Sequence, residues 1–446
     1  MQHATETSLR DLIDTALAAG AESAEAFANS NTATTAVVRL GKLEKVSRSE
    51  AERWSLRVWI GSRSAALSAN DLALKSARGA LVDKTLAMAR VAIDDPFGGL
   101  APPELIRAGW DEGAQARLDL YDPTEIDAAH LEALGREAEE AALSVRGITN
   151  SDGGSACIGC SRSSHVTSDG LVDHSLRSSF SIGVTAIAGD GAEKETDAFS
   201  HRATWLEDLY SPQAIGTEAA TRAAARLGSR KLTSTRAPVI FERRTADRLL
   251  DAFRAAISGP QLVRGASFLK DRLGQRVFPS NVRIVDDPTL VRLMDSRTVD
   301  GEGVRSVPRA LVDDGILTSW MLNAASARKL GLTPNGYGHS SWVAPSNMFV
   351  AAGSATLAEL MDQAGSGLLV TSTFGPSINP YNGDCSIGVS GLWFERGQPA
   401  YPVNEITVAG SLPEFFARVF PGADLDLHAG CNSPSLLIDA VTIAGA

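Results

Sequence analysis

Cysteine and histidine are scarce in this sequence, with 4 cysteines and 7 histidines among 446 residues. The cysteines are too few and too scattered for the disulfide scaffold that stabilises many small secreted domains. No two histidines have the H-E-x-x-H spacing that places two imidazoles and a glutamate on one helical face. These absences exclude a disulfide-rich protein and a zinc centre of the H-E-x-x-H type. The cysteines are Cys157, Cys160, Cys385 and Cys431.

Long apolar runs and excess positive charge are also absent. No uninterrupted apolar stretch approaches the roughly 20 residues that span a bilayer. The first 20 residues lack the charged and apolar regions of a secretory signal. Lys and Arg number 42 and Asp and Glu number 53, so the formal net charge is 42 − 53 = −11, which opposes a global attraction to nucleic acid. We therefore expect a cytoplasmic protein that binds neither membranes nor nucleic acid.

Motifs for phosphate binding and for a serine nucleophile are missing as well. The glycine-containing segments "GDGAEKE" and "DGEGVRS" lack the Lys-Ser/Thr of a P-loop and the G-x-G-x-x-G of a dinucleotide fold. No G-x-S-x-G elbow occurs. The sequence therefore gives no support for a nucleotide-binding enzyme or for a hydrolase with such an elbow.

Two cysteine arrangements remain as alternatives. Cys157 and Cys160, followed by His165 and His174, superficially resemble a zinc site. They lie in alternating strand sequence, where successive side chains point to opposite faces, and a structural zinc needs four converging ligands. We therefore favour small strand residues. A Cys/His hydrolase using Cys385 or Cys431 with His339 or His428 is also open, because sequence does not show whether these groups are close.

Apolar spacing and turn residues predict the order of elements in the N-terminal half. We expect helices near residues 8–20, 71–93, 123–144 and 211–229, the last opened by Ser211 as cap and Pro212 at its first position. Alternating runs predict strands over residues 24–70 and 147–205. Turns are expected at "SDGG" (151–154), "SDG" (168–170) and "GDGAE" (189–193).

The segment "GSRKLTSTRAP" (228–238) is the predicted domain boundary. Before it, residues 1–228 predict an α/β sandwich-like domain with an antiparallel sheet. After it, residues 229–446 predict a β-rich domain, with a helix near residues 244–258 and short helices at 356–364 and 412–419. The fold class expected is α+β.

Three blocks of the C-terminal half resemble the TldD/PmbA family, and more closely its PmbA (TldE) branch. They are "DGEGVRSVPRALVDDGILTSWMLNAASARKLGL" (300–332), "NGDCSIGVSGLWFERGQPAYPVNEITVAGSL" (382–412) and "SPSLLIDAVTIAG" (433–445). Weaker similarity extends over nearly the whole chain. The resemblance implies a two-subunit cytoplasmic peptidase that acts on unfolded peptides. In that family the TldD-type subunit carries a His-Glu-x-x-x-His zinc motif on a helix.

The family's zinc helix aligns with "LLDAFRAAISG", and its His, Glu and His slots fall on Asp251, Ala252 and Ala256. A methyl group can neither coordinate zinc nor take a proton from zinc-bound water. The resemblance therefore implies a chain without catalytic residues and without a metal or other cofactor of its own. Zinc is expected only in a TldD-type partner, which forms a heterodimer with this chain. A homodimer is possible when the partner is absent.

The resemblance also bears on the cysteines and on the substrate. The family usually has an aromatic residue in the slot of Cys385, which implies a packing position, and Cys431 falls out of register with the family's zinc-associated cysteine. Tyr381, Asn382 and Asp384 are loop candidates for substrate binding. An older family name, modulator of DNA gyrase, keeps open an alternative function: a stand-alone regulatory protein that acts on gyrase. Copurification of a TldD-type chain would separate the two functions.

Overall fold

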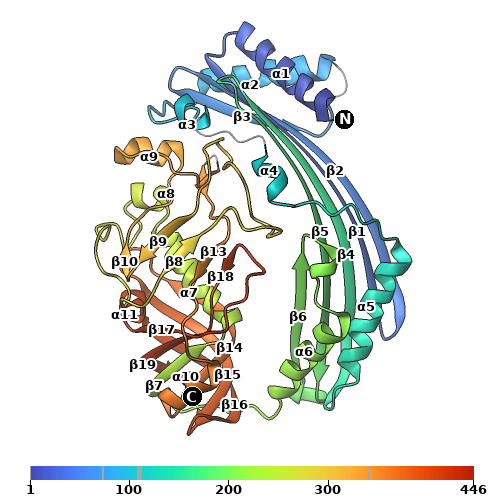
Figure 1. Ribbon diagram of the computed structural model, residues 1–446, viewed down its shortest axis with the longest axis vertical. Helices are drawn as coiled ribbons and strands as arrows, with labels where there is room; N and C mark the ends of the chain where they lie inside the picture. The colour runs from blue at the N-terminus through green and yellow to red at the C-terminus, as the bar shows by residue number, and fades with distance from the viewer. Residues whose placement is uncertain (1, 73–74, 108–112, 340, 446) are drawn as a thin grey trace.

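The computed structural model describes residues 2–72, 75–107, 113–339 and 341–445. It has two regions: a long curved antiparallel sheet with helices at both ends, and a β-rich C-terminal region toward which the sheet curves (Figure 1). The expected α+β fold class is therefore confirmed. No helix in the described segments is both long and apolar enough to cross a bilayer.

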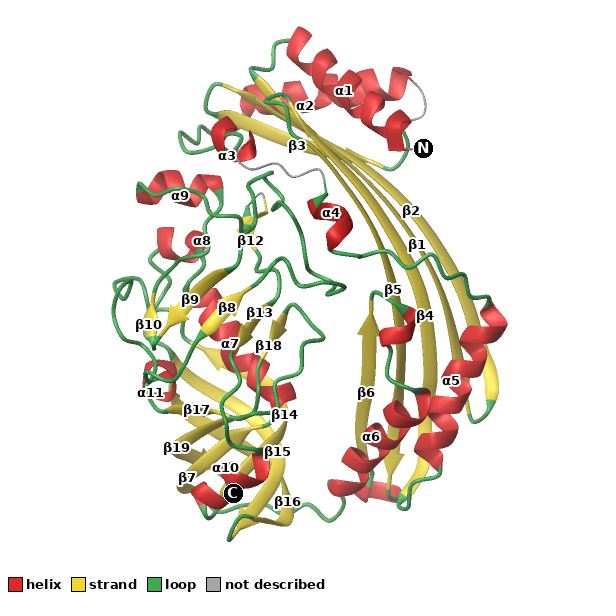
Figure 2. Cartoon of the chain, in the orientation of Figure 1, coloured by secondary structure: helices red, strands yellow, loops and turns green. Residues whose placement is uncertain are grey.

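The N-terminal sheet has six strands in the order β3-β2-β1-β4-β5-β6, and all neighbours are antiparallel. Four of its strands contain 17 to 20 residues, and their length makes the sheet curve visibly in Figure 2. The strands are β1 (Ser23–Arg39), β2 (Lys42–Ile60), β3 (Arg63–Ala69), β4 (Ile148–Thr167), β5 (Val172–Ala188) and β6 (Glu195–Ala203).

Two helix pairs pack on one face of this sheet, the face to which the even-numbered residues of β1, β2, β4 and β5 point. Helices α1 (Gln2–Ala18) and α2 (Lys75–Val91) cover one end, over buried residues such as Ala26 and Leu56. Helices α5 (Ala128–Leu143) and α6 (Pro212–Ala225) cover the other end, over residues such as Ile182 and Val184. Because strand side chains alternate, the odd-numbered residues of these strands point to the opposite face. Short helices α3 (Pro103–Arg107) and α4 (Ala114–Arg117) lie in the connection from α2 to α5.

Several predicted boundaries needed correction. The segment 151–154 is not a turn: it lies inside β4, where Gly153 adopts a φ of +111° and the pairing with β5 shifts register. Helix α5 begins at Ala128 rather than at residue 123, because Asp127 caps it by accepting a bond from the His130 N–H. Helix α1 begins at Gln2, before the predicted start. The predicted cap of α6 is confirmed, since Ser211 accepts from the Ala214 N–H at 3.2 Å.

The C-terminal region contains a barrel and a smaller sheet. The barrel strands follow the order β16-β15-β14-β7-β19-β17, and β16 also pairs with β19, which closes the ring. The smaller sheet has the order β10-β9-β8-β13-β18. The barrel strands are β7 (Thr235–Phe241), β14 (Gly367–Ile378), β15 (Asp384–Glu395), β16 (Gln398–Ser411), β17 (Val419–Pro421) and β19 (Leu436–Ala444). The others are β8 (Ile284–Asp286), β9 (Arg309–Asp313), β10 (Ile316–Leu317), β13 (Met348–Val350) and β18 (Cys431–Asn432), with a two-residue hairpin of β11 (Gly338–His339) and β12 (Trp342–Val343).

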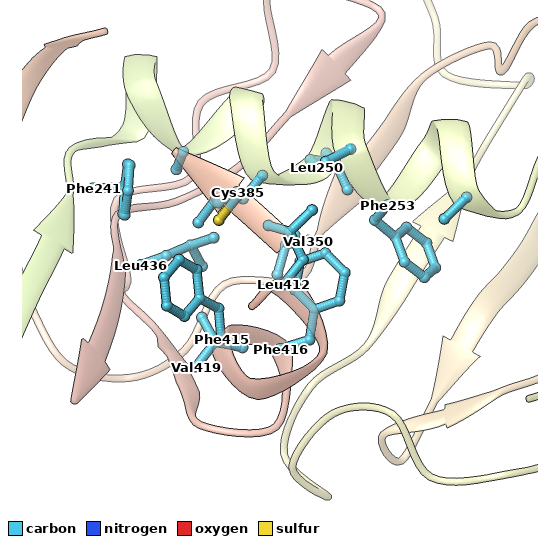
Figure 3. Packing of buried hydrophobic residues seen from close by; sticks show 14 of the residues in the cluster. Phe241, Leu250, Phe253, Val350, Cys385, Leu412, Phe415, Phe416, Val419 and Leu436 are labelled. Atoms are coloured by element: carbon cyan, nitrogen blue, oxygen red, sulfur yellow. The ribbon is translucent and has the colours of Figure 1, made fainter. Parts of the chain in front are cut away.

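Helix α7 (Arg243–Ala256) packs against both sheets and forms the centre of the C-terminal core. Its Phe253 ring meets Phe278 edge-on at 5.4 Å between centroids, and Cys385 of β15 lies in the same core (Figure 3). Alternation on β7 explains the layering: Val239 and Phe241 face the α7 cluster, whereas Ile240 faces the cluster under α10 (Leu357–Ala364). The remaining helices are α8 (Gly259–Val263), α9 (Ala324–Leu330) and α11 (Leu412–Phe416).

The chain passes from the first region to the second through residues 226–234, between α6 and β7. The predicted boundary after residue 228 lies in this connection and stays a prediction.

Candidate functional site

One face of α7 lines an apolar groove of about 300 Å³. The helix contributes Arg248, Asp251, Ala252, Ala255 and Ala256. Their spacing of three and four residues places them on one face of the helix. The opposite face is buried in the core. The three positions predicted to align with a zinc motif are therefore brought together along one wall of a real groove.

The other wall of the groove comes from β14, β15 and the segment after α8. Pro376 and Ile378 end β14, Ile387 belongs to β15, and Phe268 closes the groove from the α8 side. The Ser267 hydroxyl donates to the Ala256 carbonyl at 2.6 Å and ties this segment to the end of α7. The groove is thus fixed by elements that the core already holds.

The residues in the three slots do not fit a zinc ion. Ala252 and Ala256 offer methyl groups without donor atoms, and the Asp251 carboxylate already accepts from the Arg254 side chain at 3.1 Å. Among the residues that the structure describes, no group of three His, Cys, Asp or Glu side chains could hold a metal ion. No chemical step at this groove can therefore be derived through a metal held by this chain.

The predicted substrate-binding residues lie beside the groove but do not line it. Tyr381 is 67% exposed and follows Pro380, which does line the groove. Asn382 and Asp384 bond to each other: the Asn382 amide donates to the Asp384 carboxylate at 2.7 Å. The Asp384 N–H in turn donates to the Asn382 side-chain oxygen at 3.0 Å. The turn is therefore self-contained, and Tyr381 is the member with the most free surface.

Both candidate cysteines have thiols that resist ionisation. Burial raises the pKa of Cys385 to about 11. Burial, followed by the negative charge of Asp251, raises the pKa of Cys431 to about 12. A nucleophilic cysteine needs the opposite shift, because the thiolate is the reactive form. His339 and His428 are not among the groups that act on either thiol.

The residues of the possible zinc site around Cys157 and Cys160 do not converge on one point. Cys157 and Cys160 lie along β4 as free thiols. His165 places its Nε2 3.3 Å from Glu25, and His174 places its Nε2 3.3 Å from Glu6. The two histidines of the considered zinc arrangement therefore contact different glutamates.

Strand β14 leaves part of one edge unpaired beside the groove. It pairs with β7 only through Leu368–Val370, whereas its pairing with β15 continues to Ile378. Over residues 371–378 the edge away from β15 has no neighbouring strand in the described part of the chain. A free strand edge beside side-chain pockets is the arrangement that binds extended peptides by main-chain hydrogen bonds.

Three family models together match most of the chain. A model of the PmbA/TldA metallopeptidase C-terminal domain matches residues 234–445, which contain α7 and the groove. Models of the central domain and of domain 1 match residues 121–227 and 24–89. The chain belongs to the PmbA/TldD metallopeptidase family.

The full-length relatives in this family carry the PmbA name. Metalloprotease PmbA of Escherichia coli O157:H7 is 31% identical over 442 residues, covering 98% of this chain and 96% of the relative. A PmbA homologue of Haemophilus influenzae is 32% identical over 437 residues, covering 97% and 94%. The recognised similarity to the PmbA branch is therefore confirmed.

Solved structures share the fold of this family member. A putative modulator of DNA gyrase from Bacteroides thetaiotaomicron superposes with a TM-score of 0.92 at 23% identity, covering 99% of both chains. TldE from Thermococcus kodakarensis gives a TM-score of 0.83 at 16% identity, covering 98% of this chain and 100% of that one. At these identities the likeness shows the fold alone.

Sequence reasoning missed most of the groove. The helical stripe from Arg248 to Ala256 was a usable signal, because its members recur every three or four residues. The residues on the other wall gave no signal. Phe268, Pro376 and Ile387 come from separate elements whose contact depends on the tertiary fold.

Proposed function

We propose that this chain is the non-catalytic PmbA/TldE-type subunit of a heterodimeric zinc peptidase of the cytoplasm, which degrades or processes unfolded peptides. The partner is a TldD-type subunit that supplies the zinc and the general base. The observation that carries the proposal is the occupancy of the α7 groove by Ala252 and Ala256, which have no atoms for either task.

The role of this chain is to hold the substrate. Residues 372–378 of β14 offer main-chain groups on an edge that has no neighbouring strand, and such groups bind an extended backbone whatever its sequence. The groove beside them accepts apolar side chains of the peptide, since its walls are largely alanine, proline, isoleucine and phenylalanine. Tyr381, Asn382 and Asp384 form the rim at the end of this edge.

The competing proposal is a stand-alone protein that acts on DNA gyrase. Its support is that two solved structures with this fold, from Bacteroides thetaiotaomicron and Thermotoga maritima, are named putative modulators of DNA gyrase. A peptidase subunit and a gyrase regulator differ in a measurable way: the first requires a TldD-type chain for activity, and the second does not.

The deciding experiment is coexpression of this chain, tagged, with the TldD-type chain of the same organism. We expect a stable complex that cleaves an unfolded peptide and contains zinc, whereas this chain purified alone contains well under one zinc per chain and cleaves nothing. A complex in which the TldD-type His-Glu-x-x-x-His glutamate is changed to glutamine is the control, and it should be inactive. Chelator-sensitive cleavage by this chain alone would overturn the proposal, as would failure of the two chains to associate.

A further inference from the structure

A second hollow lies between the two regions of the molecule. It is a cavity of about 540 Å³, bounded on one side by the odd-numbered face of the N-terminal sheet. On the other side it is bounded by residues 295–301, His339 and residues 342–345 of the C-terminal region. Figure 2 shows these two regions facing each other. The cavity shares no lining residue with the α7 groove.

The register of the sheet brings polar side chains together on the cavity wall. Phe27 of β1 pairs with Ser55 of β2 and with His165 of β4, and His165 pairs with Asp173 of β5. These four residues form a row across four strands on the odd-numbered face. The face of these strands that lines the cavity is therefore mainly polar. The other face, which the helices cover, is apolar.

The positively charged groups of the cavity are already engaged by protein partners. Arg177 donates to the Met294 and Ser296 carbonyls, both at 2.7 Å, and so links β5 to the C-terminal region. Arg297 donates to the carbonyls of Pro345, Ala344 and Gly336. Arg177 therefore joins the two walls, and Arg297 joins segments within the C-terminal wall.

The Glu25 carboxylate is engaged as well. Its Oε2 lies 3.3 Å from the His165 Nε2, and its Oε1 lies 3.6 Å from the Arg57 side chain. The carboxylate is thus shared between two basic groups of its own sheet.

Two carboxylates remain without such partners. Asp173 and Asp295 line the cavity from opposite walls. In the described ranges of the chain neither forms a salt bridge or accepts a hydrogen bond from a side chain, and Asp173 accepts one from the His174 N–H. The cavity walls partly withdraw water from both groups, which raises the pKa of each, and Arg177 attracts both of them. Asp173 and Asp295 can therefore still accept hydrogen bonds from a ligand, whereas Arg177 and Arg297 already donate to protein carbonyls.

Trp342 and His339 form an aromatic part of the cavity lining. Trp342 is 51% exposed, and the His339 ring meets it edge-on at 4.2 Å between centroids. The face of an exposed indole attracts cations, which adds to the attraction of nearby carboxylates. Both features therefore attract a positively charged occupant.

Strand β18 lies between the cavity and the helix of the peptide groove. A Cβ added to Gly430 would come 2.5 Å from the Asp295 carboxylate, so Asp295 adjoins the residue that precedes β18. Strand β18 in turn packs against α7. The cavity and the groove are therefore neighbouring sites of the C-terminal region.

We propose that this cavity binds a cationic group of the unfolded peptide, namely the ammonium or guanidinium group of a lysine or arginine side chain or the peptide's amino terminus. The inference rests on the proposed function, because it takes an unfolded peptide as the occupant. It adds a preference for basic peptides that main-chain binding at β14 does not provide.

The test measures binding of two fluorescein-labelled, N-acetylated unfolded peptides to the purified full-length chain by fluorescence anisotropy. One peptide contains three lysines, and its twin has glutamine at those positions. The variant is Asp173→Asn/Asp295→Asn. The control is Asp14→Asn/Asp83→Asn, which changes the net charge equally at exposed sites outside the cavity. Melting temperatures confirm that both variants are folded, and spermidine is titrated as a small competing cation.

We expect the lysine peptide to bind the wild-type chain at least tenfold more tightly than the glutamine peptide. The cavity variant should lose that preference, and the control variant should keep it. Equal affinity of the cavity variant and the wild-type chain for the lysine peptide would overturn the cation site.

Two further outcomes separate the cation site from the proposed function. If spermidine binds the wild-type chain and not the cavity variant while neither peptide binds, the cation site stands, and the peptide as occupant is overturned together with the peptide-holding role. If both peptides bind equally to all three proteins, peptide holding stands and the cation site is overturned.

Discussion

The α7 groove and the interdomain cavity are opposites in chemistry. The groove is built mainly from small and apolar side chains, and its helix presents alanines at two of the three positions that we expected to align with a zinc motif. The cavity is built from arginines, carboxylates and histidines contributed by both regions. Of the two sites, the cavity therefore has more charged lining residues than the groove.

Under the two proposals, this chain determines what is bound without supplying catalytic donors. An apolar groove beside a free strand edge accepts many sequences, because main-chain bonds do not depend on side chains. A cavity whose carboxylates lack side-chain partners selects for positive charge, because a cation supplies the missing partner. The proposed sites would supply affinity and selectivity separately, so variants at each one should affect only one of these properties.

The largest effect is expected from filling the groove. Ala255→Trp places an indole in the groove from an exposed position of α7, and we expect peptide affinity to fall at least a hundredfold, about 2.7 kcal/mol. The preference for the lysine peptide over its glutamine twin should survive in the residual binding. Ala129→Trp, at an exposed site of α5, is the matched control and should bind normally. Unchanged affinity of the Ala255→Trp chain would remove the groove from the proposed peptide site.

A smaller effect is expected from separating the cavity walls. Arg177→Met removes the donors to the Met294 and Ser296 carbonyls. We expect the free energy of unfolding to fall by about 2 kcal/mol, because hydrogen bonds from charged groups are worth about 1.5–3 kcal/mol each and part of the loss is recovered by water. Urea denaturation measures the change.

The control for this variant is Arg48→Met. Arg48 forms an exposed ion pair with Glu50, with 69% and 63% of the two side chains exposed. Such pairs contribute about 0–1 kcal/mol, so this variant should be nearly neutral. If the two arginine variants lose equal stability, Arg177 does not link the regions.

A pH-dependent effect of about 1 kcal/mol or more is expected at Glu302, which adjoins the cavity wall at Gly301. Burial, and then the charge of Asp300, raises the pKa of Glu302 from 4.5 to about 8. Between these values the folded chain holds a proton that the unfolded chain releases, so stability is present below pH 4.5 and is lost as pH rises through 8. Glu302→Gln cannot ionise, and its amide oxygen can still accept the Ala324 N–H.

Urea midpoints at pH 5, 7 and 9 test this prediction. The Glu302→Gln chain should gain stability relative to wild type as pH increases. The exposed control Glu44→Gln should show the same pH dependence as the wild-type chain. Parallel curves for the Glu302→Gln and wild-type chains would mean that Glu302 is ionised in the fold throughout this range.

The smallest effect is expected at the cysteines. Cys385→Ser and Cys431→Ser should each leave the activity of the two-subunit complex within a few-fold of wild type, because both thiols have pKa values well above neutrality. Loss of a covalent nucleophile would cost several orders of magnitude. Activity more than a thousandfold lower in either folded variant would assign the chemistry to this chain.

Local signals predicted the elements of the N-terminal region well. Ser211 and Pro212 marked the start of α6, and the turn after β4 was correctly expected at residues 168–170. The error at residues 151–154 arose because a bulge and a turn use the same residues: glycine at positive φ serves both. Only pairing with β5 across the sheet decides between them.

The two sites were predictable to very different degrees. Asp251, Ala252 and Ala256 were singled out by the resemblance to the family's zinc helix, and helical periodicity is consistent with their sharing a face. The cavity could not be predicted, because Phe27, His165 and Asp173 become neighbours only through strand register. That register depends on turn and bulge positions that the sequence determines only in combination. The presence of Asp295 in the same cavity depends further on how the two regions pack.

The closure of the barrel has a consequence for biosynthesis. Strand β19 joins β7 and β16, and its contact between Arg236 and Ala440 spans 204 positions of sequence. The ribosome adds about 5–20 residues per second, so roughly 10 to 40 s pass between the synthesis of β7 and that of its partner strand β19. The N-terminal sheet is complete by residue 203, long before this wait begins. During translation a finished sheet is therefore tethered to an open barrel, whose apolar β7 edge is exposed to wrong strand pairing until β19 is made.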